Sequence, residues 1–159
     1  NRLYEIRSLE LDQMVTPRFG NGRWSGNYNL FEENDGIIQT VSQDLKDILK
    51  KQLNSKIFIR DSFFNILRAG GGLVRHNHLG VFDKDPYLKL NNQKYSLVYY
   101  LQVGDQSVDE PGFLQLFDPD ESILPSDEML IIFPAGREHS ASYGGEQDRI
   151  IIGVNFYAL

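Results

Sequence analysis

The stretch GGGLVRHNH, residues 70–78, sets the expectations for both the fold and the chemistry of this chain. Its two histidines, His76 and His78, are separated by one residue, so on an extended segment they project to the same face. They can therefore bind one metal ion together. The third histidine of the chain, His139, follows the turn PAG at residues 134–136 and must be brought to the other two by the fold.

Composition limits the other sites and partners that the chain can have. The absence of cysteine excludes disulfides, thiolate metal sites and cysteine nucleophiles. The formal net charge of −6 and the pI of about 5.0 argue against a nucleic-acid partner, which needs clustered Lys and Arg. No apolar stretch approaches the roughly 20 residues of a membrane span, and no signal peptide is recognisable. We therefore expect no membrane partner and a cytoplasmic location, while a start at Asn1 leaves a longer protein open.

The pattern of apolar residues predicts a mainly β fold in one domain, residues 1–159. Residues 37–53 have helical spacing, with Asn34 or Asp35 placed as the cap, so residues 1–54 are expected to support a β core at 55–159. Strands are expected near residues 56–68, 73–78, 95–103, 112–117, 128–133, 138–143 and 149–158. Because no helical pattern separates these strands, a doubly wound parallel sheet is excluded. A jelly roll, which closes two sheets over an interior, is the expected architecture.

The last expected strand, residues 149–158, has two different faces. The even-numbered face is wholly apolar and belongs in a core. The other face carries Arg149, Ile151, Gly153 and Asn155, a composition suited to lining a cavity that holds an anion. The same alternation places Tyr100 toward the cavity. The alternative for Arg149 is an ion pair with an acidic residue of the preceding turn, residues 146–148.

A metal held by imidazoles and oxygen donors, with coordination positions left open, is typical of non-haem iron oxygenases. Arg149 meets a further requirement of that chemistry. Its planar guanidinium can hold a carboxylate through two parallel hydrogen bonds, and thus the far end of a dicarboxylate whose near end chelates the metal.

At this point the sequence resembles the prolyl-hydroxylase-like iron(II)/2-oxoglutarate dioxygenases, and among them oxygenases with a His-x-His element. The resemblance covers about residues 60–158. It rests on VRHNH at 74–78, SLVYYL at 96–101, GFLQLFDP at 112–119, the Phe133-Pro134 segment leading to His139, and Arg149.

The resemblance implies a double-stranded β-helix, which is a jelly roll, and iron(II) ligation by His76 and His139. It implies that Arg149, helped by the Tyr100 hydroxyl, binds the distal carboxylate of 2-oxoglutarate. The implied reaction uses dioxygen to decarboxylate 2-oxoglutarate to succinate and to hydroxylate a substrate C–H bond. Two positions depart from the family. His78 stands where relatives have Asp or Glu, and Ile151 stands where many have Ser or Thr. We treat His78 as the third candidate ligand, while a two-histidine site stays open.

Two other interpretations stay open. The chain also resembles the cupins, whose His-x-His and Pro-x-Gly-x-x-His motifs occur at residues 76–78 and 134–139. The cupin glutamate is missing, and only Asp83 is nearby. Such a protein could be an isomerase or a dioxygenase that needs no 2-oxoglutarate. The third interpretation is a jelly-roll binding module without catalysis.

The substrate is not legible from the sequence: a peptide, an amino acid and a small metabolite all stay open, as does the oligomeric state. Residues 18–36 and 80–94 are candidate selectivity segments. The first is read as an irregular loop, either a substrate lid or a loop fixed to the core by Trp24 and Tyr28. Arg75 and Arg137 flank the histidine elements, and we expect them to be paired at the surface.

Overall fold

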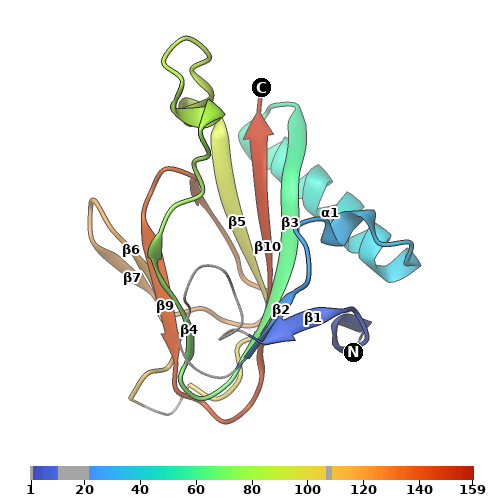
Figure 1. The fold of residues 1–159 in the computed structure, drawn as a ribbon, viewed down its shortest axis with the longest axis vertical. Helices are drawn as coiled ribbons and strands as arrows, with labels where there is room; N and C mark the ends of the chain where they lie inside the picture. Colours follow the sequence, from blue (N-terminus) through green and yellow to red (C-terminus); the bar gives the residue numbers. More distant parts are fainter. Residues whose placement is uncertain (1, 11–21, 107–108) are drawn as a thin grey trace.

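Two antiparallel β-sheets face each other, and a long helix lies outside them (Figure 1). The computed structural model describes residues 2–10, 22–106 and 109–159. Within these ranges one sheet has six strands in the order β1-β2-β3-β10-β5-β8, and the other has four in the order β4-β9-β6-β7. The strands are β1 (Ser8–Glu10), β2 (Gly22–Ser25), β3 (Ile57–Leu67), β4 (Gly71–His76), β5 (Lys94–Gln102), β6 (Leu114–Leu116), β7 (Glu121–Ile123), β8 (Leu130–Pro134), β9 (His139–Tyr143) and β10 (Arg149–Ala158). The helix is α1 (Gly36–Leu53), and short 3₁₀ helices cover Arg2–Tyr4, Leu30–Glu32, Phe82–Lys84 and Leu90–Asn92.

Helix α1 begins where its sequence predicts. One carboxylate oxygen of Asp35 accepts hydrogen bonds from the backbone N–H groups of Ile37 and Ile38, at 3.0 and 3.1 Å. These bonds satisfy two of the amides that have no partner within a helix. The helix ends before Asn54, which adopts the left-handed conformation common at helix ends. The predicted helix is thus confirmed, one residue longer at its start.

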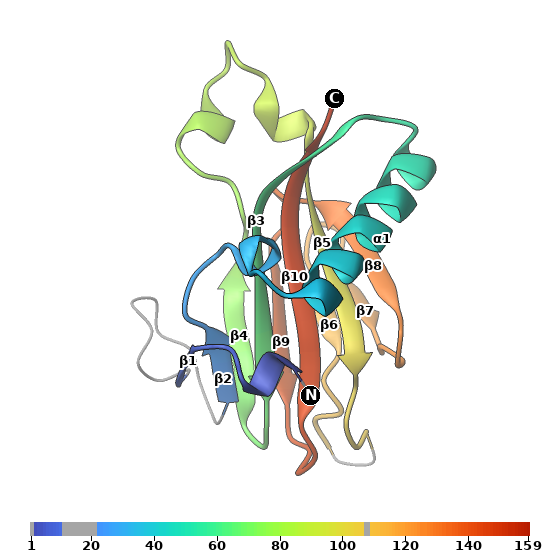
Figure 2. The ribbon, with the colours of Figure 1, turned by 90° about the vertical axis from the view of Figure 1, so that its right-hand side faces the viewer.

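The apolar stripe of α1 packs on the outer face of the six-stranded sheet (Figure 2). On the helix side, Leu45 and Leu49 are almost fully buried. The sheet contributes the even-numbered residues of β10 as predicted, together with residues of β3 and β5. The fully buried sheet residues of this cluster are Phe64, Ile66, Leu97, Ile152, Val154 and Phe156. Because this face is filled by the helix, the opposite face of the same strands is directed toward the four-stranded sheet.

The mainly β jelly-roll prediction is confirmed, and each strand expected after residue 55 is present within a few residues. The short strands β2 and β7 were not expected. Strand β2 lies in the segment that the sequence predicts to be an irregular loop. The Gly- and Asn-rich composition of this segment disfavours a strand, and β2 forms because it pairs with β3. Trp24 in β2 is buried and stacks on Phe63, so this tryptophan does fix the segment to the interior. Residues 18–21 lie outside the described residues.

Among the residues that the structure describes, no helix has the length and apolar character needed to span a membrane.

Candidate metal centre

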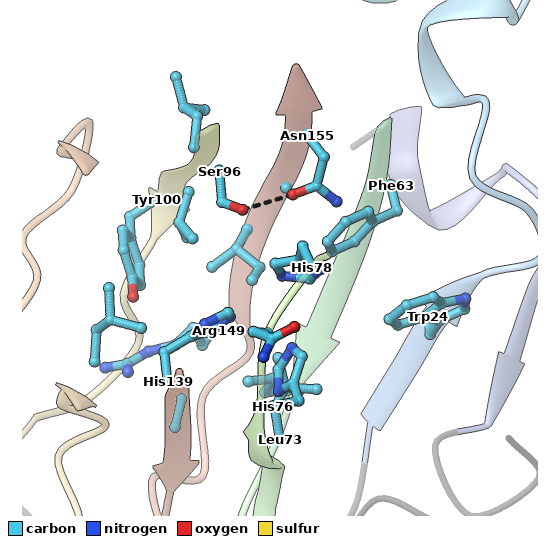
Figure 3. A pocket seen from close by; sticks show the side chains of 18 of the residues that line it. Trp24, Phe63, Leu73, His76, His78, Ser96, Tyr100, His139, Arg149 and Asn155 are labelled. Atoms are coloured by element: carbon cyan, nitrogen blue, oxygen red, sulfur yellow. Dashed lines mark hydrogen bonds between the residues drawn. The ribbon is translucent and has the colours of Figure 1, made fainter. Parts of the chain in front are cut away.

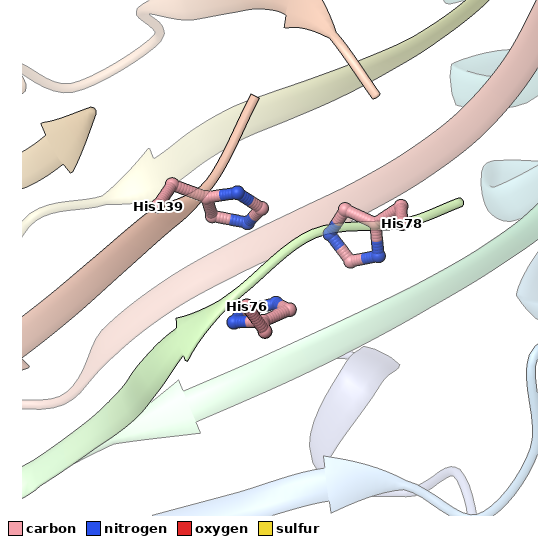
Figure 4. Close-up of side chains that lie close together, drawn as sticks. All are labelled: His76, His78 and His139. Atoms are coloured by element: carbon pink, nitrogen blue, oxygen red, sulfur yellow. The ribbon is translucent and has the colours of Figure 1, made fainter. Parts of the chain in front are cut away.

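The three histidines come together where β4 and β9 meet (Figure 4). His76 ends β4, His139 begins β9, and the two are paired across the sheet. His78 lies two residues beyond the strand, and its backbone N–H donates to the carbonyl of Ala135 at 2.9 Å. One ligand nitrogen from each of the three side chains lies within 4.8 Å of the others.

Backbone carbonyls orient two of the rings. Nδ1 of His76 lies 2.7 Å from the carbonyl oxygen of Val74, and Nδ1 of His139 lies 3.2 Å from that of Arg137. A carbonyl oxygen can only accept, so each Nδ1 carries the proton and Nε2 carries the lone pair. Metal-binding histidines commonly have this arrangement, in which the second nitrogen fixes the tautomer and the ring plane.

The donor set is three imidazoles without a carboxylate. Within the described residues, the group of potential ligands consists of His76, His78 and His139. Asp83, the acid nearest in sequence to a cupin glutamate, instead accepts hydrogen bonds from Lys94 and Tyr157. Imidazole ligands suit iron, zinc, copper and nickel. Bonds of about 2.1 Å place ligand nitrogens at most about 4.2 Å apart, so small rotations of the half-buried His76 and His78 would complete a shared site.

The histidines line a cavity of about 240 Å³ between the two sheets (Figure 3). Its walls are mostly apolar and aromatic, and its polar groups are few. At one end lie Arg149 and Tyr100, with the Tyr100 hydroxyl directed toward the arginine. Further along β10 lies Asn155, which is joined to Ser96 of the neighbouring strand β5 by a hydrogen bond of 2.7 Å. The odd-numbered face of β10 therefore lines the cavity, as the sequence predicts.

Arg149 is 2 % exposed and is held by backbone carbonyls. Its Nε, Nη1 and Nη2 donate to the carbonyls of Val103, Gly112 and Pro111 at 2.9, 2.5 and 2.5 Å. Gly112 is required here, because a Cβ at this position would lie 1.7 Å from Nη1 of the arginine. Three of the five guanidinium N–H groups are used in this way, which leaves one on each terminal nitrogen.

The charge of Arg149 has no carboxylate partner within ion-pair distance among the described residues. The alternative of an ion pair with its own turn is not realised, since Asp148 is paired with Arg68. Burial lowers the pKa of the guanidinium, against the opposing influence of Tyr100, Tyr143 and the Asp105 carboxylate, which acts from beyond ion-pair distance. A buried cation without a counter-ion is costly, so this end of the cavity is electrostatically suited to an anion.

Tyr100 supplies a second donor at this end of the cavity. Its side chain is 3 % exposed, and the hydroxyl makes no hydrogen bond to any residue in the described part of the chain. Burial raises the pKa of this phenol to about 12, with Arg149 acting in the opposite direction. The hydroxyl is therefore protonated at neutral pH and can donate a hydrogen bond.

A polar ladder that the sequence did not reveal extends from the cavity wall across β5, β10 and β3. Ser96 donates to Oδ1 of Asn155, and Nδ2 of Asn155 donates to Asp61 at 2.6 Å. Burial raises the pKa of Asp61, although the hydrogen bond from Asn155 opposes this. The inward alternation of β5 and β10 could have indicated the Ser96–Asn155 pair, but nothing in the sequence identifies Asp61 as its third member.

A buried ion pair secures the segment that follows His78. Nζ of Lys94 lies 2.7 Å from Oδ2 of Asp83, with side chains 6 % and 3 % exposed, and it also donates to the His78 carbonyl at 2.8 Å. Tyr157 and the Gly80 amide complete the partners of the carboxylate. Burial opposes ionisation of Asp83, but these hydrogen bonds outweigh it and hold the pKa of the carboxyl below its usual value.

We expect Asp83→Ala to lower the free energy of unfolding by about 3–5 kcal/mol, because Lys94 would be left buried without its counter-ion. Urea denaturation at neutral pH measures the change. Asp44→Ala, on the exposed face of α1, is the control and should change it by less than about 0.5 kcal/mol. The double variant Asp83→Leu/Lys94→Met should be clearly more stable than Asp83→Ala. A single variant within 1 kcal/mol of wild type would contradict the assignment.

Arg75 and Arg137 are paired at the surface, as expected. Arg75 contacts Glu138 at 2.5 Å, and Arg137 contacts Glu121 at 3.2 Å. Neither arginine is among the residues that line the cavity.

Solved structures share this fold at low sequence identity. A 2OG-Fe(II) oxygenase family oxidoreductase from Burkholderia pseudomallei is 11 % identical with a TM-score of 0.66, over 98 % of this chain and 74 % of its own. A prolyl hydroxylase from Trichoplax adhaerens, solved with a peptide of hypoxia inducible factor, is 17 % identical with a TM-score of 0.62, over 86 % and 63 %. A protein described as a predicted oxalate decarboxylase from Thermotoga maritima is 16 % identical with a TM-score of 0.54, over 99 % and 97 %. No protein-family model and no curated protein sequence matches the chain. The similarity to oxygenases and prolyl hydroxylases is thus one of fold, accompanied by a cluster of three histidines.

Proposed function

We propose that this protein is an iron(II)- and 2-oxoglutarate-dependent dioxygenase that hydroxylates a C–H bond. One observation carries the proposal: a cavity lined by three clustered histidines also contains a buried arginine that no carboxylate of the described chain contacts. A ligand that binds a metal at one end and carries a carboxylate at the other would satisfy both groups. 2-Oxoglutarate has this chemistry.

The histidines and the Arg149–Tyr100 end of the cavity would bind different parts of the iron–2-oxoglutarate pair. His76, His78 and His139 would hold the iron through nitrogen, with two of the rings already oriented by backbone carbonyls. Arg149 would bind the distal carboxylate with its remaining N–H groups, and the Tyr100 hydroxyl would add a third hydrogen bond. When bound, iron and 2-oxoglutarate supply the oxidising chemistry, in which decarboxylation to succinate is coupled to hydroxylation. The apolar walls keep water away from these polar groups and so strengthen their interactions.

The substrate is proposed to enter near His78 and to meet the polar ladder of Ser96, Asn155 and Asp61. This placement follows from the opposite end of the cavity being assigned to the co-substrate. An amino acid, a peptide or a small metabolite would fit the proposal, and the peptide bound to the Trichoplax prolyl hydroxylase makes a peptide worth testing first.

The alternative is a cupin-type metalloprotein that needs no 2-oxoglutarate, and the Thermotoga structure favours it to the extent that the fold is shared. One observation counts against it. The missing carboxylate ligand departs from both families and does not separate them, but a buried arginine without a contacting carboxylate has no role in a cupin mechanism.

Turnover of 2-oxoglutarate separates the two functions. Protein loaded with iron(II) in air should form succinate slowly from 2-oxoglutarate without a substrate, and faster with a peptide or amino acid that is hydroxylated. Omission of iron is the control. If metal binds but no succinate forms under any of these conditions, the result supports the cupin alternative. If no metal binds, the result supports a binding module without catalysis.

The role of His78 is tested by His78→Ala. If all three histidines bind the metal, iron(II) affinity should fall by more than about a hundredfold, because the loss of a direct ligand should exceed the effect of losing a group that only supports one. An anaerobic iron titration measures this. The Ser140→Ala variant on β9 changes a position outside the cavity lining, keeps all three imidazoles and should retain the affinity. Unchanged affinity in His78→Ala would mean that the metal is held by two histidines.

A further inference from the structure

Asn65 is the buried polar side chain that the structure leaves without partners. It is 0 % exposed, and among the described residues neither Oδ1 nor Nδ2 of its amide has a hydrogen-bond partner. Leaving both ends of a buried amide unsatisfied costs far more than an apolar residue of the same size would. Such a group in a folded protein requires an explanation, and a ligand-binding role is one.

The position of Asn65 connects it to the cavity. It lies in β3 and is paired with Trp24 on β2 and with Ile151 on β10. Along its own strand, Phe63 and Leu67 share its face. All four of these neighbours line the cavity. The amide therefore lies directly behind the cavity wall, and the layer between them consists of side chains, which rotate more easily than backbone moves.

The register of β3 and β10 places Asn65 toward the Arg149 end. Arg149 is paired with Leu67, Ile151 with Asn65, and Asn155 with Asp61. Asn65 is thus one inward-facing row from Arg149, roughly 7 Å along the strand, and two rows from the polar ladder. Ile151, its cross-strand neighbour, offers no hydrogen bond. In this row Tyr100 supplies a donor from β5, and Asn65 is the residue that can supply one from β3.

We propose that Asn65 is a binding residue for the oxo-acid co-substrate, whose carboxylate accepts a hydrogen bond from Nδ2 of the amide. The inference rests on the proposed function and adds a residue to it. The amide is neutral, so it adds a donor without adding a second positive charge beside Arg149. Side-chain rotation of Asn65, or of Leu67 and Ile151 in front of it, brings the donor to the cavity as the ligand binds.

Asn65→Leu tests the proposal because a binding role predicts a higher thermal midpoint together with a lower affinity for 2-oxoglutarate. Leucine has the same number of side-chain heavy atoms in the same branching and no polar atoms, so the thermal midpoint of the ligand-free protein should rise. Affinity of the iron-loaded protein for 2-oxoglutarate, measured anaerobically, should fall about tenfold to a hundredfold, as for one lost hydrogen bond to a charged group. The affinity for iron(II) alone should stay unchanged. Asn65→Ala, which removes the amide without adding bulk, should show the same loss of 2-oxoglutarate affinity.

Asn155→Leu is the matched control for stability. The same substitution there leaves Ser96 and Asp61 without their partner, so its midpoint should fall. If Asn65→Leu also lowers the midpoint, the amide has a structural partner such as a trapped water, and the proposal is overturned. Unchanged 2-oxoglutarate affinity in both Asn65 variants overturns it as well. If the wild type itself binds iron but not 2-oxoglutarate, the proposed function fails first, and that result is distinct from either of these.

Discussion

The His139→Ala variant should lose stoichiometric iron(II) binding and all turnover that depends on it. His139 is 3 % exposed, and its ring lies 4.3 Å from that of His76 and 5.0 Å from that of His78, measured between centroids. It is also the one candidate ligand that comes from a different strand. Without it, two imidazoles from a single segment are left to hold the ion. Loss of a direct ligand should exceed the 10- to 100-fold effect typical of groups that only support ligands.

Equilibrium titration with iron(II) under anaerobic conditions measures this effect, and metal content after desalting gives a second readout. Ser140→Ala is the matched control, because Ser140 is the next residue of β9 and points to the other face of the strand. It should bind iron as the wild type does. A His139→Ala protein that is folded by circular dichroism and binds iron with wild-type affinity would remove His139 from the metal site.

The second large effect is expected for Arg149→Ala, which should weaken 2-oxoglutarate binding at least a hundredfold while iron still binds. Two charge-assisted hydrogen bonds to the distal carboxylate are lost, each contributing about 1.5–3 kcal/mol. The same change removes the donors for the carbonyls of Val103, Pro111 and Gly112. The thermal midpoint should therefore fall too, and stability must be measured beside affinity.

Tyr100→Phe separates an effect on co-substrate binding from an effect on protein stability at this end of the cavity. The Tyr100 hydroxyl has no hydrogen-bond partner among the described residues, so its removal should leave the stability unchanged. If the hydroxyl binds the carboxylate, 2-oxoglutarate affinity should still fall about tenfold. Normal co-substrate affinity in a folded Arg149→Ala protein would refute the role of the arginine, whatever Tyr100→Phe shows.

The fold was predictable because its determinants are local. Alternation along residues 149–158 distinguishes the helix-covered face from the cavity face, and helical spacing with an Asp35 cap marks α1. Strands β2 and β7 were missed because each is short and becomes a strand only through its partner. For example, Trp24 of β2 is paired with Asn65 of β3, and no local sequence pattern predicts this pairing.

The site was predictable in its chemistry but not in its electrostatics. Three histidines in two strand-end contexts, with a downstream arginine, are visible in the sequence. The three carbonyls that accept hydrogen bonds from Arg149 are not, because the tertiary structure alone brings Val103, Pro111 and Gly112 to the guanidinium. For the same reason the unpaired amide of Asn65 and the pairing of Asp83 with Lys94 could not be read from the sequence. For each of these side chains, the tertiary structure alone determines which hydrogen-bond or ion-pair partner is present and which is missing.

The most direct test of the central claim is an anaerobic titration of the purified protein, first with iron(II) and then with 2-oxoglutarate, followed by visible absorption. If the protein binds the oxo acid to the metal, a weak charge-transfer band should appear on the second addition, be absent in His139→Ala, and need far more 2-oxoglutarate in Arg149→Ala. Iron binding without any band, and without measurable 2-oxoglutarate affinity by calorimetry, would contradict the assignment of this cavity to an oxo-acid-dependent oxygenase.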